Sequence, residues 1–145
     1  MDIASQLGPP SNFRCNEFGH LCNGLFLNRN ALVNDVNVAV AYSDCTSNDT
    51  DGYLLSVRDT VNRIRALKAD DGQVMVAAIT GPRAPYVVNW RAPYTADSSC
   101  GAASCPWPMI AHSCTASDGS FADPAVRIGD MVDRFGANGR CARRD

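Results

Sequence analysis

The residues of this sequence with the clearest capacity for chemistry are its seven cysteines. They are Cys15, Cys22, Cys45, Cys100, Cys105, Cys114 and Cys141. A cytosolic protein of 145 residues rarely carries so many thiols unless it binds a metal or performs redox chemistry. No Cys-x-x-Cys pair occurs, although that spacing is the commonest one in redox motifs and zinc ribbons. The cysteine content therefore predicts disulfide bonds and an extracytoplasmic location: secreted, periplasmic or at the cell surface.

Spacing suggests partners for these cysteines but does not fix their connectivity. The expected bridges are Cys100–Cys105, Cys114–Cys141 and one pair drawn from Cys15, Cys22 and Cys45. The alternative is a zinc site with unusual ligand spacing, whose ligands would be Cys100, Cys105, His112 and Cys114. The odd number of cysteines leaves one without a partner, and residues 1–10 contain no secretory signal. Together these facts predict a fragment cut from a longer exported precursor.

Three aspartates near Ser47 offer oxygen ligands for calcium: Asp44, Asp49 and Asp51. Calcium needs several such oxygens, but this segment lacks the glycine and the distal glutamate that an EF-hand loop places at fixed positions. We interpret residues 43–52 as a polar, turn-rich loop that caps the helix after it, since Asp and Thr are common N-cap residues. The three aspartates remain weak candidates for a metal site.

A histidine beside a cysteine is also the basis of cysteine hydrolases, and His112 lies close in sequence to Cys105 and Cys114. Such an enzyme needs a group that orients the histidine and an oxyanion hole, and no motif here marks either. We interpret His112 as a residue packed beside a disulfide-bonded loop. The sequence therefore predicts no enzymatic activity.

Large aromatic residues gather in the same part of the chain: Trp90, Tyr94 and Trp107, with Tyr86 nearby. Trp and Tyr anchor many protein interfaces, so these residues are candidates for an interaction surface. The competing interpretation is that they anchor the long loop that carries them, through half-buried packing.

Length and charge limit the classes of function. A chain of 145 residues suits one domain. Its net charge of -2 gives no global electrostatic reason to expect a nucleic-acid partner. No apolar run approaches the roughly 20 residues that a membrane span requires.

The elements that would position these side chains begin after a cysteine-containing loop over residues 1–30. A strand is predicted within 31–42, where apolar and polar residues alternate. An amphipathic helix is predicted over 52–68, because Val57, Val61 and Ile64 recur at steps of three and four. The short apolar run over 73–79 predicts a strand buried on both faces. Residues 31–81 are thus a strand–helix–strand unit, which is typical of a parallel α/β sheet.

The second half of the chain is predicted to be less regular. Residues 82–121 show no lasting periodicity, which predicts a long loop held by disulfides. A helix is predicted over 122–136, with Asp123-Pro124 as its start and Gly136 as its end. Residues 137–145, which carry an arginine cluster, are predicted to be a solvated tail. The chain as a whole, 1–145, is predicted to be one partial domain.

Several segments, in the same order, resemble bacterial secreted von Willebrand factor type A (VWA)-like proteins. They begin with Leu7-Gly8-Pro9 and Phe13-Arg14-Cys15-Asn16-Glu17-Phe18-Gly19, continue with Tyr53-Leu54 and Val76-Ala77-Ala78-Ile79-Thr80-Gly81-Pro82, and end with His112-Ser113-Cys114 and Ala122-Asp123-Pro124-Ala125-Val126-Arg127-Ile128. The resemblance covers most of residues 7–136 but only the C-terminal half of the family's domain. It implies an incomplete doubly wound, Rossmann-like α/β fold with long disulfide-stapled loops.

The resemblance also implies binding or adhesion rather than catalysis. The family's adhesion site holds a divalent cation such as Mg or Ca on an Asp-x-Ser-x-Ser loop, and that motif does not occur here. A cation is therefore implied only for the complete family domain, and no cofactor is predicted for this chain. We predict a non-catalytic binding or adhesion module whose partner is an unknown protein or surface ligand. The alternatives are a stand-alone small disulfide-rich secreted protein and the Cys–His hydrolase.

Overall fold

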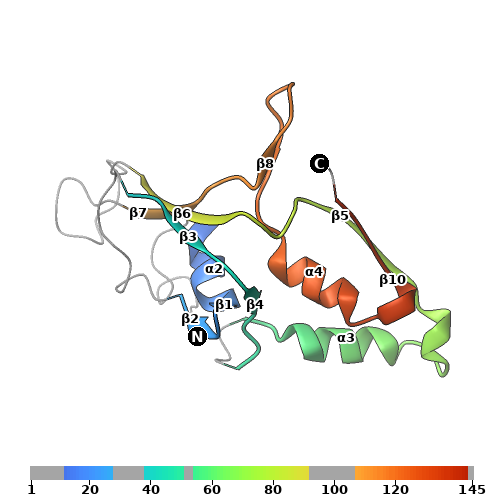
Figure 1. Ribbon diagram of the computed structural model, residues 1–145. Coiled ribbons are helices and arrows are strands. Elements are labelled where there is room, and N and C mark those ends of the chain that lie inside the picture. The colour runs from blue at the N-terminus through green and yellow to red at the C-terminus, as the bar shows by residue number, and fades with distance from the viewer. Residues whose placement is uncertain (1–11, 28–37, 51–53, 92–106, 144–145) are drawn as a thin grey trace.

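The computed structural model describes residues 12–27, 38–50, 54–91 and 107–143. Over these residues the chain is an α+β structure made of short α-helices, several short antiparallel sheets and one parallel pair of strands (Figure 1). The predicted doubly wound, Rossmann-like sheet is wrong, because β5 and β10 are the only parallel neighbours among the described strands. None of the described helices has the length and apolar character needed to cross a membrane.

The first sheet lies beside the first described helix. Its elements are α2 (Asn12–Gly19), β1 (His20–Cys22), β2 (Leu25–Phe26) and β4 (Cys45–Ser47). Strand β1 is central, with β2 and β4 antiparallel on either side. Asn23 and Gly24 join β1 to β2 with φ angles of 51° and 73°. Positive φ at both positions is typical of a type I′ hairpin turn, for which Asn-Gly is the favoured pair. The loop predicted for residues 1–30 is therefore wrong over residues 12–26.

The second sheet supplies much of the core. It consists of β3 (Val40–Tyr42), β6 (Tyr86–Arg91) and β7 (Trp107–Ile110), antiparallel in that order. Tyr86 and Val88 point inward from β6 and are at most 1% exposed. They pack with Cys22, Ile110 and other buried apolar residues in one cluster. The strand predicted within 31–42 is confirmed at its end, and residues 31–37 lie outside the described part of the chain.

The long loop predicted over residues 82–121 is wrong where the structure describes it. This segment contains β6, β7 and a hairpin of β8 (Cys114–Thr115) and β9 (Phe121–Ala122). Its prolines masked the strands, but Pro108 lies on β7, an edge strand, where a missing N–H is tolerated. Residues 92–106 lie outside the described ranges.

Helix α3 (Val57–Arg65) confirms the helix predicted over 52–68, with shorter bounds. Its buried face carries Val57 and Val61, as the periodicity predicted. The start is set by Ser56, whose hydroxyl accepts a hydrogen bond from the Asp59 amide at 3.1 Å. Leu67, beyond the end of the helix, is 74% exposed.

The parallel pair joins β5 (Val76–Thr80) to β10 (Gly139–Arg143). The 3-10 turn Asp71–Gln73 precedes β5. Burial alternates along β5, so the prediction of a strand buried on both faces is wrong: Ala77 and Ile79 are exposed. The solvated tail predicted over 137–145 is wrong over residues 139–143, which form β10, and residues 144–145 lie outside the described part of the chain.

Helix α4 (Val126–Asp133) packs against both parallel strands and confirms the core of the helix predicted over 122–136. The 3-10 turn Gly136–Asn138 links it to β10. Asp123 does not cap the helix; the N-cap is Ala125, which makes no side-chain capping bond. Gly139 lies so close to α4 that an added Cβ would overlap the Val132 carbonyl oxygen. The start of β10 is therefore seated directly on the helix.

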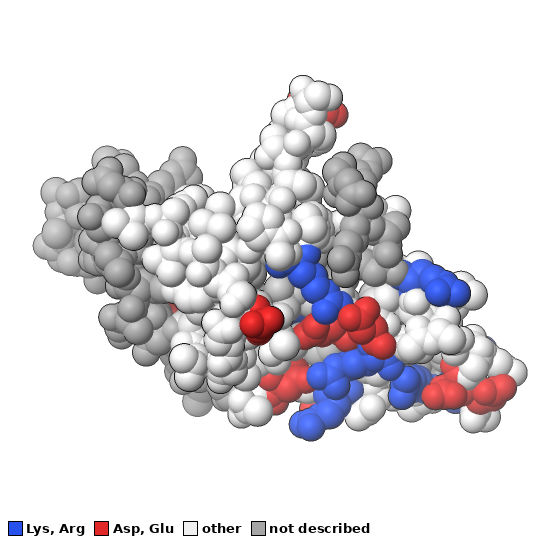
Figure 2. All heavy atoms as spheres, in the orientation of Figure 1, with Lys and Arg blue, Asp and Glu red and all other residues white. Residues whose placement is uncertain are grey.

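Apart from the β8–β9 hairpin, the described elements form two regions. We call α2, β1–β4, β6 and β7 the disulfide region, and α3, β5, α4 and β10 the parallel region. Arg127 of α4 links them by donating to the carbonyls of Gly19 (3.0 Å), Asn48 (3.2 Å) and Leu55 (2.6 Å). On the face of the molecule in Figure 2, basic and acidic side chains lie next to one another. Arg83 pairs with Asp130 at 3.0 Å and with Asp133 at 2.6 Å.

Candidate functional site

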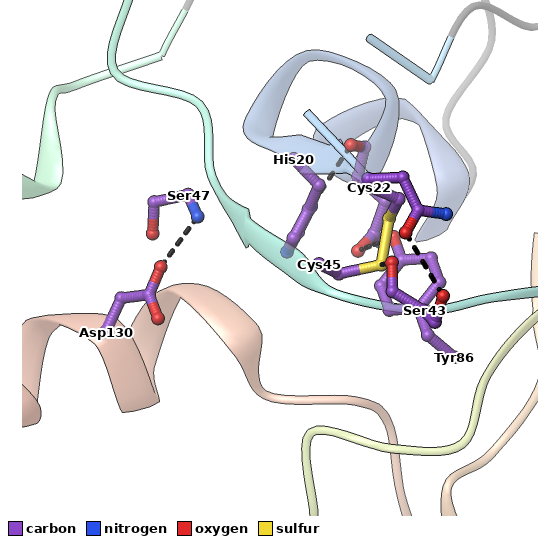
Figure 3. The surroundings of a disulfide bond; sticks show 9 residues. His20, Cys22, Ser43, Cys45, Ser47, Tyr86 and Asp130 are labelled. Atoms are coloured by element: carbon purple, nitrogen blue, oxygen red, sulfur yellow. Dashed lines mark hydrogen bonds between the residues drawn. A yellow bond between two sulfur atoms is a disulfide. The ribbon is translucent and has the colours of Figure 1, made fainter. Parts of the chain in front are cut away.

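Cys22 and Cys45 form a disulfide between directly opposed residues of β1 and β4 (Figure 3). The Cα atoms are 4.0 Å apart, and Cys22 is 3% exposed within the core cluster. The predicted pair among the first three cysteines is therefore Cys22–Cys45, and Cys15 is an exposed free thiol. Sequence spacing left this choice open because it depends on the β1–β4 register.

The other predicted bridges have different outcomes. Cys114 is a half-buried free thiol on β8, so the predicted Cys114–Cys141 bridge is wrong. Cys141 lies on β10, which pairs with β5 rather than with the hairpin. Cys100 and Cys105 lie outside the described residues, so their bridge and the zinc alternative stay predictions.

The aspartates that were weak metal candidates are not brought together as a site. The Asp49 carboxylate accepts hydrogen bonds from the backbone N–H of Val57 (2.7 Å) and Arg58 (3.2 Å) at the start of α3. Asp44 lies in the turn before β4 with a φ of 50°, and Asp51 lies outside the described residues. The described residues contain no group of three or more His, Cys, Asp or Glu side chains that could hold a metal. For Asp49, the helix-capping interpretation is confirmed.

A buried polar pair that sequence reasoning missed lies beside the disulfide (Figure 3). His20 of β1 is directly opposite Ser47 of β4, and His20 is 5% exposed. His20 Nδ1 is 3.1 Å from the Asn16 carbonyl oxygen, which can only accept, so Nδ1 carries the proton. His20 Nε2 is then a bare acceptor, and neither it nor Ser47 Oγ has a hydrogen-bond partner within the described chain.

This pair has the residue types of a nucleophile and a base but not the access. Both atoms are buried, so a substrate does not reach them from solvent. Burial lowers the pKa of His20 to about 4, against the smaller raising effect of its backbone hydrogen bond. Asp130 binds the Ser47 N–H at 2.6 Å, which ties this strand to α4 (Figure 3). The pair is a neutral, buried structural element of the disulfide region.

The aromatic candidates fall into three classes. Tyr86 is core: its hydroxyl donates to Asn16 Oδ1 at 2.8 Å, and burial raises its pKa. Trp90 and Trp107 lie on the paired strands β6 and β7, where Trp90 is opposite Pro108 and Trp107 is opposite Arg91. Tyr94 lies outside the described residues. The interaction surface proposed for Trp90, Tyr94 and Trp107 therefore stays a prediction.

The feature best placed to meet another molecule is the β8–β9 hairpin, which projects from the body of the protein (Figure 1). Phe121 on this hairpin is 61% exposed. Its ring stacks on His112, with centroids 3.6 Å apart and planes tilted by 22°. His112 Nδ1 is 2.7 Å from Asp123 Oδ1. Asp123 and His112 therefore hold the exposed phenyl ring in one orientation.

Both ends of the hairpin are fixed by local contacts. At the tip, Asp118 Oδ1 accepts from the Ser120 N–H (2.9 Å) and hydroxyl (2.6 Å), and these bonds lower the pKa of Asp118. Gly119 adopts a φ of 85°, which a residue with a Cβ rarely does. At the base, Gly81 lies so close to the hairpin that an added Cβ would be 2.7 Å from the Ala122 Cβ. The hairpin is a preformed projection.

Comparison with protein-family models, with curated proteins and with solved structures finds no match for this chain. The resemblance to VWA-like proteins therefore stays a prediction that rests on sequence segments alone.

Proposed function

We propose that this chain is a non-catalytic binding module of an exported protein, and that the β8–β9 hairpin contacts the partner. The observation that carries the proposal is the Phe121 ring, which is 61% exposed yet held in place by His112 and Asp123. Exposed aromatic side chains are frequent hot spots of protein interfaces. A ring that is already oriented loses less conformational freedom on binding than a mobile one.

The chemistry of the hairpin indicates the kind of surface it fits. Residues 112–123 contain two aspartates, Asp118 and Asp123, and no Lys or Arg. A partner protein with an apolar pocket for Phe121 and basic residues around that pocket would complement both the ring and the charge. The backbone edges of a two-stranded hairpin also offer N–H and C=O groups to an extended partner segment.

The extracytoplasmic location is part of the same proposal. It is supported by the Cys22–Cys45 disulfide, whose Cys22 is almost fully buried in the core. Structural disulfides of this kind form and persist in oxidising compartments and are rare in the reducing cytosol.

Site-specific photo-crosslinking tests the contact directly. A benzophenone amino acid replaces Phe121 in one variant and Leu67, which is 74% exposed in the parallel region, in a matched control. The proposal predicts that the Phe121 position crosslinks in native cells to one discrete extracytoplasmic protein and that the Leu67 position does not. Equal crosslinking from both positions, or none from Phe121, would contradict the proposal.

The affinity of each variant for that crosslinked protein then measures how much the Phe121 ring contributes to binding. Phe121→Ala should weaken binding by about 2 kcal/mol or more if the ring is a hot spot. Leu67→Ala should leave the affinity unchanged. A Phe121→Ala variant that binds as tightly as the original chain would remove the ring from the interface.

A thiol-dependent hydrolase is the second candidate, favoured by one observation. Asp123 pairs with His112 at 2.7 Å, as an orienting carboxylate pairs with a general base. Cys114 is the nearest described cysteine in sequence, and its thiol is half-buried. Alkylation of Cys114 that abolishes a hydrolytic activity measured with ester or peptide substrates would favour this candidate over the binding module.

A further inference from the structure

The sheet of the parallel region contains two described strands, which is unusually few for a parallel sheet. Parallel strands are normally buried inside larger sheets that are covered on both faces. Here β5 pairs with β10 alone among the described strands, and α4 packs against one face (Figure 1). Within the described residues, no strand pairs with the second edge of β5, and a strand from another molecule could be added there.

The two edges of this sheet differ in charge. Strand β5 has the sequence VAAIT, with no charged residue and no proline. Strand β10 has the sequence GRCAR, with Arg140 exposed. Charges and prolines are the usual devices that prevent edge-to-edge pairing, so β10 is protected and β5 is not.

The face of β5 turned away from α4 is apolar. Ile79 is 79% exposed, Met75 just before the strand is 81% exposed, and Ala77 between them is also exposed. Alternating residues of a strand share one face, so these three side chains form a single row. Exposed apolar residues that are grouped in this way mark interaction sites more often than isolated ones do.

We propose that β5 is a self-association edge, through which two copies of this chain pair their β5 strands antiparallel about a twofold axis. The result is a continuous sheet in the order β10–β5–β5–β10. A twofold axis requires one surface that is complementary to itself. With the axis at Ala78, each Ala77 lies opposite Ile79 of the second copy, and Val76 lies opposite Thr80. A small residue thus faces a large one at both exposed positions.

Charge favours pairing of two copies through their β5 strands over pairing through their β10 strands. Pairing β5 with β5 brings no like charges together, because the strand has none. Pairing β10 with β10 would place arginines of both copies side by side, which is unfavourable. The proposal is independent of the β8–β9 hairpin and of its partner.

Sedimentation velocity of the purified chain over a wide concentration range tests the proposal. The expected result is a reversible monomer–dimer equilibrium, weakened by about tenfold or more in Ile79→Lys and in Ala77→Lys, a loss of about 1.4 kcal/mol or more. The control is Leu55→Lys, at a position that is 81% exposed on the chain before α3, and it should dimerise like the original. Circular dichroism and retention of the Cys22–Cys45 bridge show that each variant is folded.

Three outcomes would overturn the proposal. The first is a wild-type chain that stays monomeric at every concentration. The second is a dimer that both β5 variants leave intact, which would place the contact on another surface. The third is a monomer whose Ile79 position crosslinks to a different protein, which would make β5 a site for another partner.

Discussion

The disulfide region buries its apolar side chains more completely than the parallel region does. In the disulfide region, Tyr86, Val88 and Ile110 are at most 3% exposed, and a covalent bond closes the sheet beside them. In the parallel region, Met75 and Ile79 remain about four-fifths exposed (81% and 79%) although α4 covers the other face. A sheet of two strands with one covering layer leaves one apolar face for solvent or for a partner.

Different interactions stabilise the two regions. The disulfide region has a buried cluster, a cross-link and the Tyr86–Asn16 hydrogen bond at 2.8 Å. The parallel region depends on the contact of β10 with α4 and on the capping of α3.

The largest effect is expected from removing the cross-link. Replacing Cys22 and Cys45 by serine opens a loop with a sequence separation of 23, which should lower the free energy of unfolding by about 3 kcal/mol. Chemical denaturation measures the change. Cys15→Ser is the matched control, because that thiol is free and exposed, and it should leave stability unchanged. A double variant as stable as the original would show that the bridge does not close this region.

Acid should weaken the same region through His20. Its folded pKa of about 4 lies below its ordinary value of 6.5, so the unfolded chain binds more protons between these two pH values. The stabilising contribution is complete above pH 6.5 and is lost as the pH falls to 4, by about 3 kcal/mol at most.

The variant His20→Phe isolates this contribution, because it removes the buried imidazole and keeps an apolar ring in its place. Denaturation curves between pH 4 and 6.5 should show a shallower loss of stability in His20→Phe than in the original. An unchanged slope in His20→Phe would show that His20 is not buried in its neutral form.

The parallel region should respond to a single added methyl group. Gly139→Ala places a Cβ against the Val132 carbonyl, so β10 must move away from α4. Overpacking of this kind costs about 1 to 3 kcal/mol. Urea denaturation measures the loss, and Ala77→Ser, on the exposed face of β5, is the control expected to stay within about 0.5 kcal/mol. Equal effects of the two changes would mean that β10 is not seated on the helix.

A smaller effect is expected at the start of α3. Asp49→Ala removes the acceptor of two backbone N–H groups and should cost about 1 kcal/mol in thermal or chemical denaturation. Asp71→Ala removes only an exposed contact with Arg65 at 3.9 Å and should cost less than about 0.5 kcal/mol. If both changes cost the same, Asp49 does not cap the helix.

Local patterns in the sequence predicted the parts of the fold that depend on neighbours along the chain. The three- and four-residue spacing of Val57, Val61 and Ile64 predicted α3, and the short apolar run before Gly81 predicted β5. Asn23-Gly24 carried an equally local hairpin signal that was missed. The parallel partner of β5 could not be found this way, because the polar sequence GRCAR of β10 does not show a strand period.

The candidate sites were predictable only in outline. The sequence indicated a bridge among Cys15, Cys22 and Cys45, but the choice depends on residues of β1 and β4 meeting in register. The same is true of His20 and Ser47, which are far apart in the chain. His112 was singled out for its cysteine neighbours, whereas its contacts are with Phe121 and Asp123, across a hairpin. The strands of that hairpin are two residues long each, which is too short to show a strand period in the sequence.

Hydrogen exchange of backbone amides tests the contrast between the two regions most directly. The amides of β6, the central strand of the second sheet in the disulfide region, should exchange slowly at every protein concentration. The amides of β5 should exchange faster in dilute solution and become protected as the concentration rises and a second copy covers the open edge. Protection of every β5 amide equal to that of the β6 amides in dilute solution would contradict the proposal, because β5 would then have no open edge.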